Sequence, residues 1–120
     1  MAKVVGIGGV FLKARDQGAL RAWYRDVLGL DVTEWGATLT NDAGSEGVWN
    51  AFAADTKYFA PSTRDFMINF RVDDLDGLLA RLRERGAQVL DRREDGEYGS
   101  FGYVVDPEGT LLELWQPLPR

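Results

Sequence analysis

The sequence predicts an α+β fold of two βαβββ modules, with the helices outside and a concave, partly open barrel-like sheet inside. Two segments, beginning at Val10 and Ile68, share the same order of strand, acidic residue, helix and terminal glycine. Each segment is followed by a series of short strand-like runs. The 120 residues suit a single domain made of two halves, which we place at about residues 1–58 and 59–120.

The first half begins with a strand and an amphipathic helix. In GIGGVFLKA, strand alternation places Gly9, Phe11 and Lys13 on one face and the apolar residues between them on the other. Asp16 can cap the helix that follows, and Gly29 ends it. We expect three short strands in LDVTEW, ATLT and GVWNAFA, broken by the loop NDAGSEG.

The second half repeats this order after the loop TKYFAPSTRD. FMINFRV is a strand, Asp73 or Asp74 caps the next helix, and Gly86 ends it. The final strands are AQVLDRRE, YGSFGYVVD and TLLELWQP, joined by turns at EDGE and DPEG.

Composition excludes several classes of function. The formal charge of −5 argues against nucleic-acid binding, which needs a basic face. No apolar run is long enough to span a membrane, and no secretory signal pattern is visible, so we expect a cytoplasmic protein. The chain has no His and no Cys, which excludes imidazole bases, thiolate nucleophiles and His-ligated zinc.

Three stretches resemble a known family: GGVFLKARDQGALRAWYRDVLGLDV, FMINFRVDDLDGLLARLRERGAQV and GYVVDPEGTLLELWQP. They are similar to the glyoxalase, bleomycin-resistance and extradiol-dioxygenase family, the vicinal oxygen chelate superfamily. The resemblance covers essentially the whole chain and implies the fold given above. It also implies a divalent metal on the inner face of the sheet, with ligands from the first and last strands of each half.

The residues at these ligand positions argue against a metal. The resemblance places the four positions at Gly9, near Ala51, at Met67 and at Glu113. Only Glu113 offers an oxygen ligand, and a catalytic metal normally needs about three protein ligands. We therefore predict no metal and no other cofactor.

The inner face instead offers an apolar and aromatic lining with a few polar groups, which suits a small-molecule pocket. The predicted ligand-binding residues are Phe11, Lys13, Trp49, Met67, Asn69, Arg71 and Trp115. Glu113 has three open interpretations: an internal partner of Arg71, Lys13 or a Tyr hydroxyl, a hydrogen-bond partner of a ligand, or a catalytic acid or base.

The leading functional hypothesis is a metal-independent protein that binds a small, partly aromatic or cationic molecule, as resistance proteins of the superfamily do. The alternative is an enzyme of lyase, isomerase or dioxygenase type that uses Glu113 as acid, base or weak metal ligand. A third possibility is a domain without a pocket that serves association. We also predict a homodimer, with no nucleic-acid or membrane partner.

Overall fold

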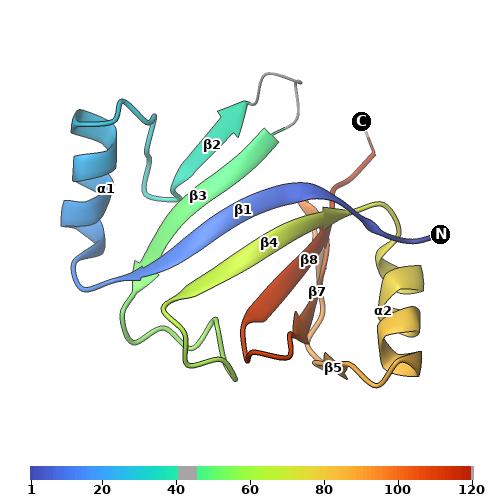
Figure 1. Ribbon diagram of the computed structural model, residues 1–120. Helices are drawn as coiled ribbons and strands as arrows, with labels where there is room; N and C mark the ends of the chain where they lie inside the picture. Colours follow the sequence, from blue (N-terminus) through green and yellow to red (C-terminus); the bar gives the residue numbers. More distant parts are fainter. Residues whose placement is uncertain (41–45, 120) are drawn as a thin grey trace.

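The computed structural model describes residues 1–40 and 46–119, in which two helices accompany a curved, eight-stranded sheet that does not close into a barrel (Figure 1). The elements in chain order are β1 (Val4–Ala14), α1 (Gln17–Asp26), β2 (Ala37–Thr40), β3 (Glu46–Ala53), β4 (Phe66–Val72), α2 (Leu75–Glu84), β5 (Gln88–Val89), β6 (Glu94–Gly96), β7 (Gly99–Val105) and β8 (Leu111–Gln116). The strand order is β2-β3-β1-β4-β8-β7-β5, and β6 pairs with β7. The predicted α+β class is confirmed.

The two halves repeat one pairing pattern and meet at the centre of the sheet. Strand β1 is parallel to β3, and β4 is parallel to β8 in the same way. Strands β1 and β4 are antiparallel to each other and join the halves. Val10 pairs with Ile68, so the residues that begin the two repeated segments lie opposite each other.

Both helix caps are confirmed. The Asp16 carboxylate accepts a hydrogen bond from the backbone N–H of Ala19 at 2.9 Å, and Asp74 accepts one from Gly77 at 3.1 Å. Gly29 and Gly86 follow the helices with φ of +76° and +77°, a left-handed conformation that favours glycine.

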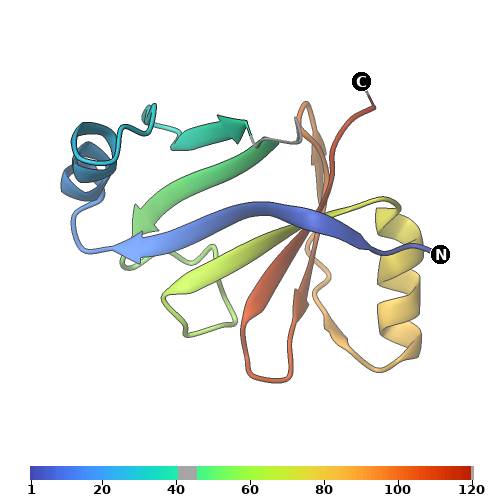
Figure 2. The ribbon, with the colours of Figure 1, turned by 45° about the horizontal axis from the view of Figure 1, so that its top comes forward.

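The helices cover one face of the sheet, which we call the helix face, and α1 and α2 lie at opposite ends of it (Figures 1 and 2). Leu75, Leu78 and Leu79 of α2 pack on β4, β7 and β8, whereas α1 contributes only half-buried residues to the cluster beneath it. A third cluster lies on the opposite, inner face. Its fully buried members are Phe59, Met67, Tyr103 and Leu111.

Two predicted strands and one predicted turn differ from the structure. The segment LDVTEW makes only a single bridge, because Thr33 and Gly36 bond each other in a tight turn. The segment AQVLDRRE forms only the two-residue β5, since the chain then turns Arg92 toward Tyr58. The predicted EDGE turn contains strand β6, which pairs with β7. Residues 41–45 of the predicted NDAGSEG loop lie outside the described residues.

Neither of the helices in residues 1–40 and 46–119 has both the length and the apolar character needed to cross a membrane.

Candidate functional site

The carboxylate of Glu113 is the centre of a buried hydrogen-bond network on the inner face. Its Oε2 atom accepts hydrogen bonds from the Tyr58 hydroxyl at 2.5 Å and the Tyr103 hydroxyl at 2.9 Å. Its Oε1 atom accepts one from Nδ2 of Asn69 at 2.7 Å. Glu113 is only 3% exposed, so these three donors replace the water that the carboxylate loses on folding. We call these four residues the carboxylate centre.

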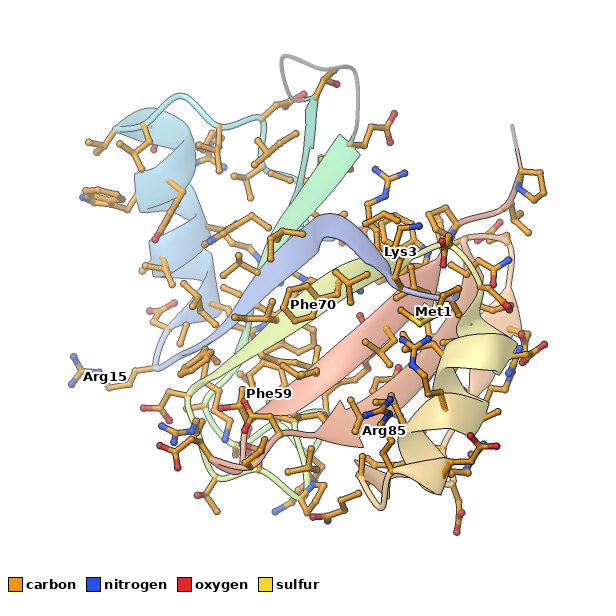
Figure 3. The ribbon with its side chains drawn as sticks, turned by 45° about the vertical axis from the view of Figure 1, so that its right-hand side comes forward. Met1, Lys3, Arg15, Phe59, Phe70 and Arg85 are labelled. Atoms are coloured by element: carbon orange, nitrogen blue, oxygen red, sulfur yellow. The ribbon has the colours of Figure 1, made fainter. Side chains whose placement is uncertain are left out.

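Sheet register brings three members of the carboxylate centre together. Glu113 pairs with Asn69 across β8 and β4 and with Tyr103 across β8 and β7, so their side chains share one face. Tyr58 arrives from the loop between β3 and β4 and carries Phe59 with it. This loop packs against the inner face, where Tyr58 bonds Glu113 and Phe59, labelled in Figure 3, is fully buried.

The surroundings keep both phenols protonated. Burial, followed by the negative charge of Glu113, raises the pKa of Tyr58 and of Tyr103 well above the ordinary tyrosine range. The guanidinium of Arg92 lies 4.2 Å from the ring centroid of Tyr58 and 4.1 Å from that of Tyr103. Its Nη1 also donates to the Tyr58 carbonyl at 3.0 Å, so a cation holds the two rings in place.

Gly8 gives the carboxylate centre the room that it needs. A Cβ atom at Gly8 would lie 2.1 Å from Oδ1 of Asn69 and 3.0 Å from side-chain atoms of Arg71 and Trp115. Oδ1 is buried and has no hydrogen-bond partner among residues 1–40 and 46–119. Asn69 is thus held by its Nδ2 bond to Glu113 and by close contact with the Gly8 backbone.

Beside this centre lies a half-buried group of side chains, which we call the aromatic shelf and define by Arg71, Phe101 and Trp115. The rings of Phe101 and Trp115 are stacked, with centroids 6.0 Å apart and an interplanar angle of 1°. The Arg71 guanidinium lies 5.6 Å from the Trp115 ring. All three side chains are partly exposed, so the shelf offers two rings and a cation to a planar ligand.

Most of the predicted lining residues do face inward. Phe11 and Met67 belong to the inner cluster with Phe59, and Lys13 places its ammonium 5.7 Å from the Phe59 ring. Met67 is fully buried, so loop packing covers it. Of the three internal partners considered for Glu113, which were Arg71, Lys13 and a Tyr hydroxyl, the structure contains the Tyr hydroxyl.

Trp49 and Ala51 lie on the opposite face from the one predicted. Trp49 pairs with Val10 and stacks on Tyr24 of α1 with centroids 4.1 Å apart, so it belongs to the helix face, and so does Ala51. A shift of one residue in a strand reverses the direction of every side chain. The strand β3 residue that corresponds to Glu113 is therefore Asn50, which pairs with Phe11 as Glu113 pairs with Asn69.

This set of residues does not fit a metal ion. Asn50 already accepts hydrogen bonds at Oδ1 from Nη2 of Arg21 and from the backbone N–H of Ala51. Gly9 has no ligand, Met67 offers only a buried thioether, and Glu113 is occupied by three donors. Across residues 1–40 and 46–119, no three His, Cys, Asp or Glu side chains are grouped as a metal site.

Two hollows of the described surface lie away from the carboxylate centre. One of about 410 Å³ lies between the loop at Pro61 and the turn at Gly109. The other, of about 470 Å³, lies where β1 ends and α1 begins. The carboxylate centre is thus a packed cluster, and the aromatic shelf beside it is an open surface.

Comparison with known proteins agrees with this topology. Residues 9–115 match the profile of the family described as a glyoxalase-like domain. The chain belongs to that family. It is therefore a glyoxalase-like protein of the vicinal oxygen chelate superfamily. No curated protein sequence matches it significantly.

Three solved structures of similar fold are an epimerase of one bacterium, an epimerase variant of another and a glyoxalase of a third. A methylmalonyl-CoA epimerase from Mycobacterium tuberculosis has 23% identity and a TM-score of 0.67, with 97% of this chain and 90% of that chain covered. A variant of the Streptomyces coelicolor methylmalonyl-CoA epimerase, in complex with 2-nitronate-propionyl-CoA, has 21% identity and a TM-score of 0.73, with 98% and 100% covered. The Mn(II)-bound glyoxalase from Novosphingobium aromaticivorans has 23% identity and a TM-score of 0.72, with 97% and 40% covered. At these identities the likeness establishes the fold alone.

Four residues of the site were missed from the sequence: Tyr58, Arg92, Phe101 and Tyr103. The hairpin around the DPEG turn contained the signal for Tyr103, because counting outward from that turn places Tyr103 opposite Glu113. Tyr58 and Arg92 reach the site from loops, and no local sequence pattern predicts such long-range contacts.

Proposed function

We propose that this glyoxalase-like protein binds a small, partly aromatic molecule on its inner face without a metal ion, as a resistance or sequestration protein. The carboxylate centre carries the proposal. Glu113 is the one carboxylate at the positions of the metal-binding pattern, and it accepts three hydrogen bonds from Tyr58, Tyr103 and Asn69. A carboxylate satisfied within the protein needs no metal ion to offset its burial.

The aromatic shelf supports an aromatic ligand with an anionic group. Stacked Phe101 and Trp115 suit a planar ring, and Arg71 adds a positive charge over the Trp115 ring. The sequence analysis allowed either a partly aromatic or a cationic ligand. A cationic group would need Glu113, whose oxygens are already occupied, so the arrangement favours the anionic form.

Titration with two matched probes tests this function. We expect 2-naphthoate to bind and to shift the indole N–H signal of Trp115, whereas 2-naphthylmethylammonium should bind more weakly. Arg71→Gln should weaken 2-naphthoate roughly tenfold or more, because it removes a charge-assisted contact. Arg83→Gln, an exposed change on α2, is the control. Equal affinity for both probes, or no effect of Arg71→Gln, would contradict the proposal.

An acid–base enzyme is the second candidate. Tyr58 is partly exposed while its hydroxyl touches buried Glu113, so it links this carboxylate to the inner face. One of the similar structures is a methylmalonyl-CoA epimerase in complex with methylmalonyl-CoA. Deuterium exchange at C2 of methylmalonyl-CoA separates the candidates. If the wild-type protein exchanges this hydrogen and Glu113→Gln does not, the result favours the enzyme. If the wild type exchanges it no faster than Glu113→Gln does, the result favours sequestration.

The cellular location and the assembly remain predictions. A chain without Cys needs no oxidising compartment for disulfides, which is consistent with the cytoplasm. Cell fractionation of the producing organism would test the location, and sedimentation would test whether the protein is a homodimer.

A further inference from the structure

The hollow of about 410 Å³ has one wall on the loop between β3 and β4 and another on the turn between β7 and β8. The loop contributes Ser62 and Arg64, and the turn contributes Glu108. The volume is near the lower end of the usual range for ligand pockets, so it suits a molecule of the size of one amino acid. Neither wall belongs to the carboxylate centre or to the aromatic shelf.

Hydrogen bonds hold the two walls of this hollow together. Nη2 of Arg64 donates to the backbone carbonyl of Glu108 at 2.9 Å, which joins the loop to the turn. Within the loop, the backbone N–H of Arg64 donates to Oγ of Ser62 at 3.1 Å. Within the turn, Oδ1 of Asp106 accepts hydrogen bonds from the backbone N–H groups of Glu108 at 2.8 Å and Thr110 at 3.0 Å. The hollow is therefore preorganised, which lowers the entropic cost of binding a ligand.

Two opposite charges line the hollow without pairing with each other. Within residues 1–40 and 46–119, neither Arg64 nor Glu108 takes part in an ion pair. The guanidinium bonds the Glu108 carbonyl instead of its carboxylate, and in the same part of the chain its Nε and Nη1 atoms have no acceptor. A simple carboxylate would be repelled by Glu108, and a simple amine would be repelled by Arg64. A molecule that carries both a carboxylate and an ammonium group matches both charges.

The rest of the lining adds an apolar surface and further hydrogen-bond donors. Val105 is a partly buried member of the inner cluster, and Pro61 lies on the loop wall. Gln88 pairs with Val105 across β5 and β7, so their side chains share one face of the sheet. Pro61 and Val105 thus suit an aliphatic side chain. The Ser62 hydroxyl and the Gln88 amide can donate to a carboxylate.

We propose that this hollow binds a free α-amino acid with an aliphatic side chain. The ligand carboxylate accepts hydrogen bonds from Arg64, whose planar guanidinium is suited to carboxylates. The ligand ammonium group pairs with the carboxylate of Glu108, and the aliphatic side chain lies on Pro61 and Val105. Since Arg64 and Glu108 are both exposed, we expect a dissociation constant of about 0.1–1 mM. The proposal goes beyond the proposed function, because the aromatic shelf takes no part in it.

Titration with leucine and its two single-charge analogues tests the site. Leucine should bind, whereas 4-methylpentanoate, which lacks the ammonium group, and 3-methylbutylamine, which lacks the carboxylate, should each bind about tenfold more weakly or worse. Leucine should shift the backbone amide signals of Thr63 and Gly109 and leave the indole N–H signal of Trp115 constant. No binding of leucine up to about 10 mM, or equal affinity for all three molecules, would overturn the proposal. A shift of the Trp115 signal without shifts at Thr63 and Gly109 would also overturn it.

Two charge-removing variants show which wall holds which group of the ligand. Arg64→Gln should weaken leucine about three- to tenfold without weakening 3-methylbutylamine. Glu108→Gln should weaken leucine by a similar factor and strengthen 4-methylpentanoate, because a repelling charge is lost.

Arg83→Gln and Glu97→Gln are the matched controls for these variants, since they remove exposed charges elsewhere and should leave every affinity unchanged. Thermal melts check that each variant is folded. Wild-type affinity for leucine in either folded variant of the hollow would overturn the proposal. Equal weakening in the controls would also overturn it, because the net charge alone would then set the affinity.

Discussion

The hydroxyl of Tyr58 lies 2.5 Å from Oε2 of Glu113, although 55 residues separate them in the chain. This contact ties the loop between β3 and β4 to the last strand of the sheet. A hydrogen bond to a carboxylate is stronger than one between neutral groups, and this one is partly buried. The position of the loop over the inner face therefore depends on Glu113.

Tyr58→Phe should destabilise the protein by about 1.5–3 kcal/mol, since it removes one hydrogen bond to the carboxylate and keeps the ring. Urea unfolding measures this change. Tyr98→Phe is the matched control, because Tyr98 is largely exposed and should change stability little. Equal stability of both variants would show that the Tyr58 hydroxyl contributes nothing to the fold.

Alkaline pH should unfold the protein through the two buried phenols. The folded protein raises the pKa of Tyr58 and Tyr103, so it binds their protons more tightly than the unfolded chain does. Their contribution to stability is complete below the unfolded value of about 10 and is lost as the pH rises above it. Unfolding free energies measured from pH 8 to 12 should fall less steeply in Tyr103→Phe than in the wild type. A parallel fall in both proteins would contradict this assignment.

Glu113→Gln should lower the free energy of unfolding by about 1–3 kcal/mol. The Gln amide nitrogen is a donor, so one or more of the present donors would lose its acceptor. Glu97→Gln, at an exposed position, is the control. In the double variant with Tyr58→Phe, the loss of unfolding free energy should be smaller than the sum of the two single losses. Both changes remove the same hydrogen bond. Full additivity would show that the two residues act independently.

Sequence patterns predicted those features of the fold that neighbouring residues determine. The Asp16 cap, a cap at Asp73 or Asp74 and the glycine ends follow from local spacing. Strand alternation, together with the ligand positions that the family resemblance implies, predicted the inward direction of Phe11, Asn69 and Glu113. Trp49 shows the limit of the same rule. Its face depends on the exact length of the chain before β3, and a single residue of displacement turned it toward α1.

The carboxylate centre depends on contacts that no local rule supplies. The sequence offered a Tyr hydroxyl as one partner of Glu113, but it gave no means of choosing among the tyrosines. Tyr103 follows once the hairpin register is known. Tyr58 and Arg92 depend on the course of two irregular segments, which tertiary packing decides.

The purified protein should contain well below one equivalent of zinc, nickel, manganese or iron per chain. Gly9, Asn50 and Met67 supply no free ligand beside Glu113, and one carboxylate is too few for a stable site. Elemental analysis after dialysis against each metal measures the content. One equivalent of metal that is lost in Glu113→Ala would overturn this prediction and place the metal at the carboxylate centre.

Gly8→Ala should destabilise the protein and displace Asn69, because the added Cβ would lie 2.1 Å from its Oδ1 atom. Asn69 cannot move away without weakening its bond to Glu113, so we expect a loss of about 1–3 kcal/mol from overpacking. Gly6→Ala is the matched control on the same strand, since a Cβ there meets nothing within 4 Å. Chemical shifts of the Asn69 side-chain amide should change in Gly8→Ala and stay constant in Gly6→Ala. If both variants melt at the wild-type temperature with unchanged Asn69 signals, the close contact between Gly8 and Asn69 does not constrain the carboxylate centre.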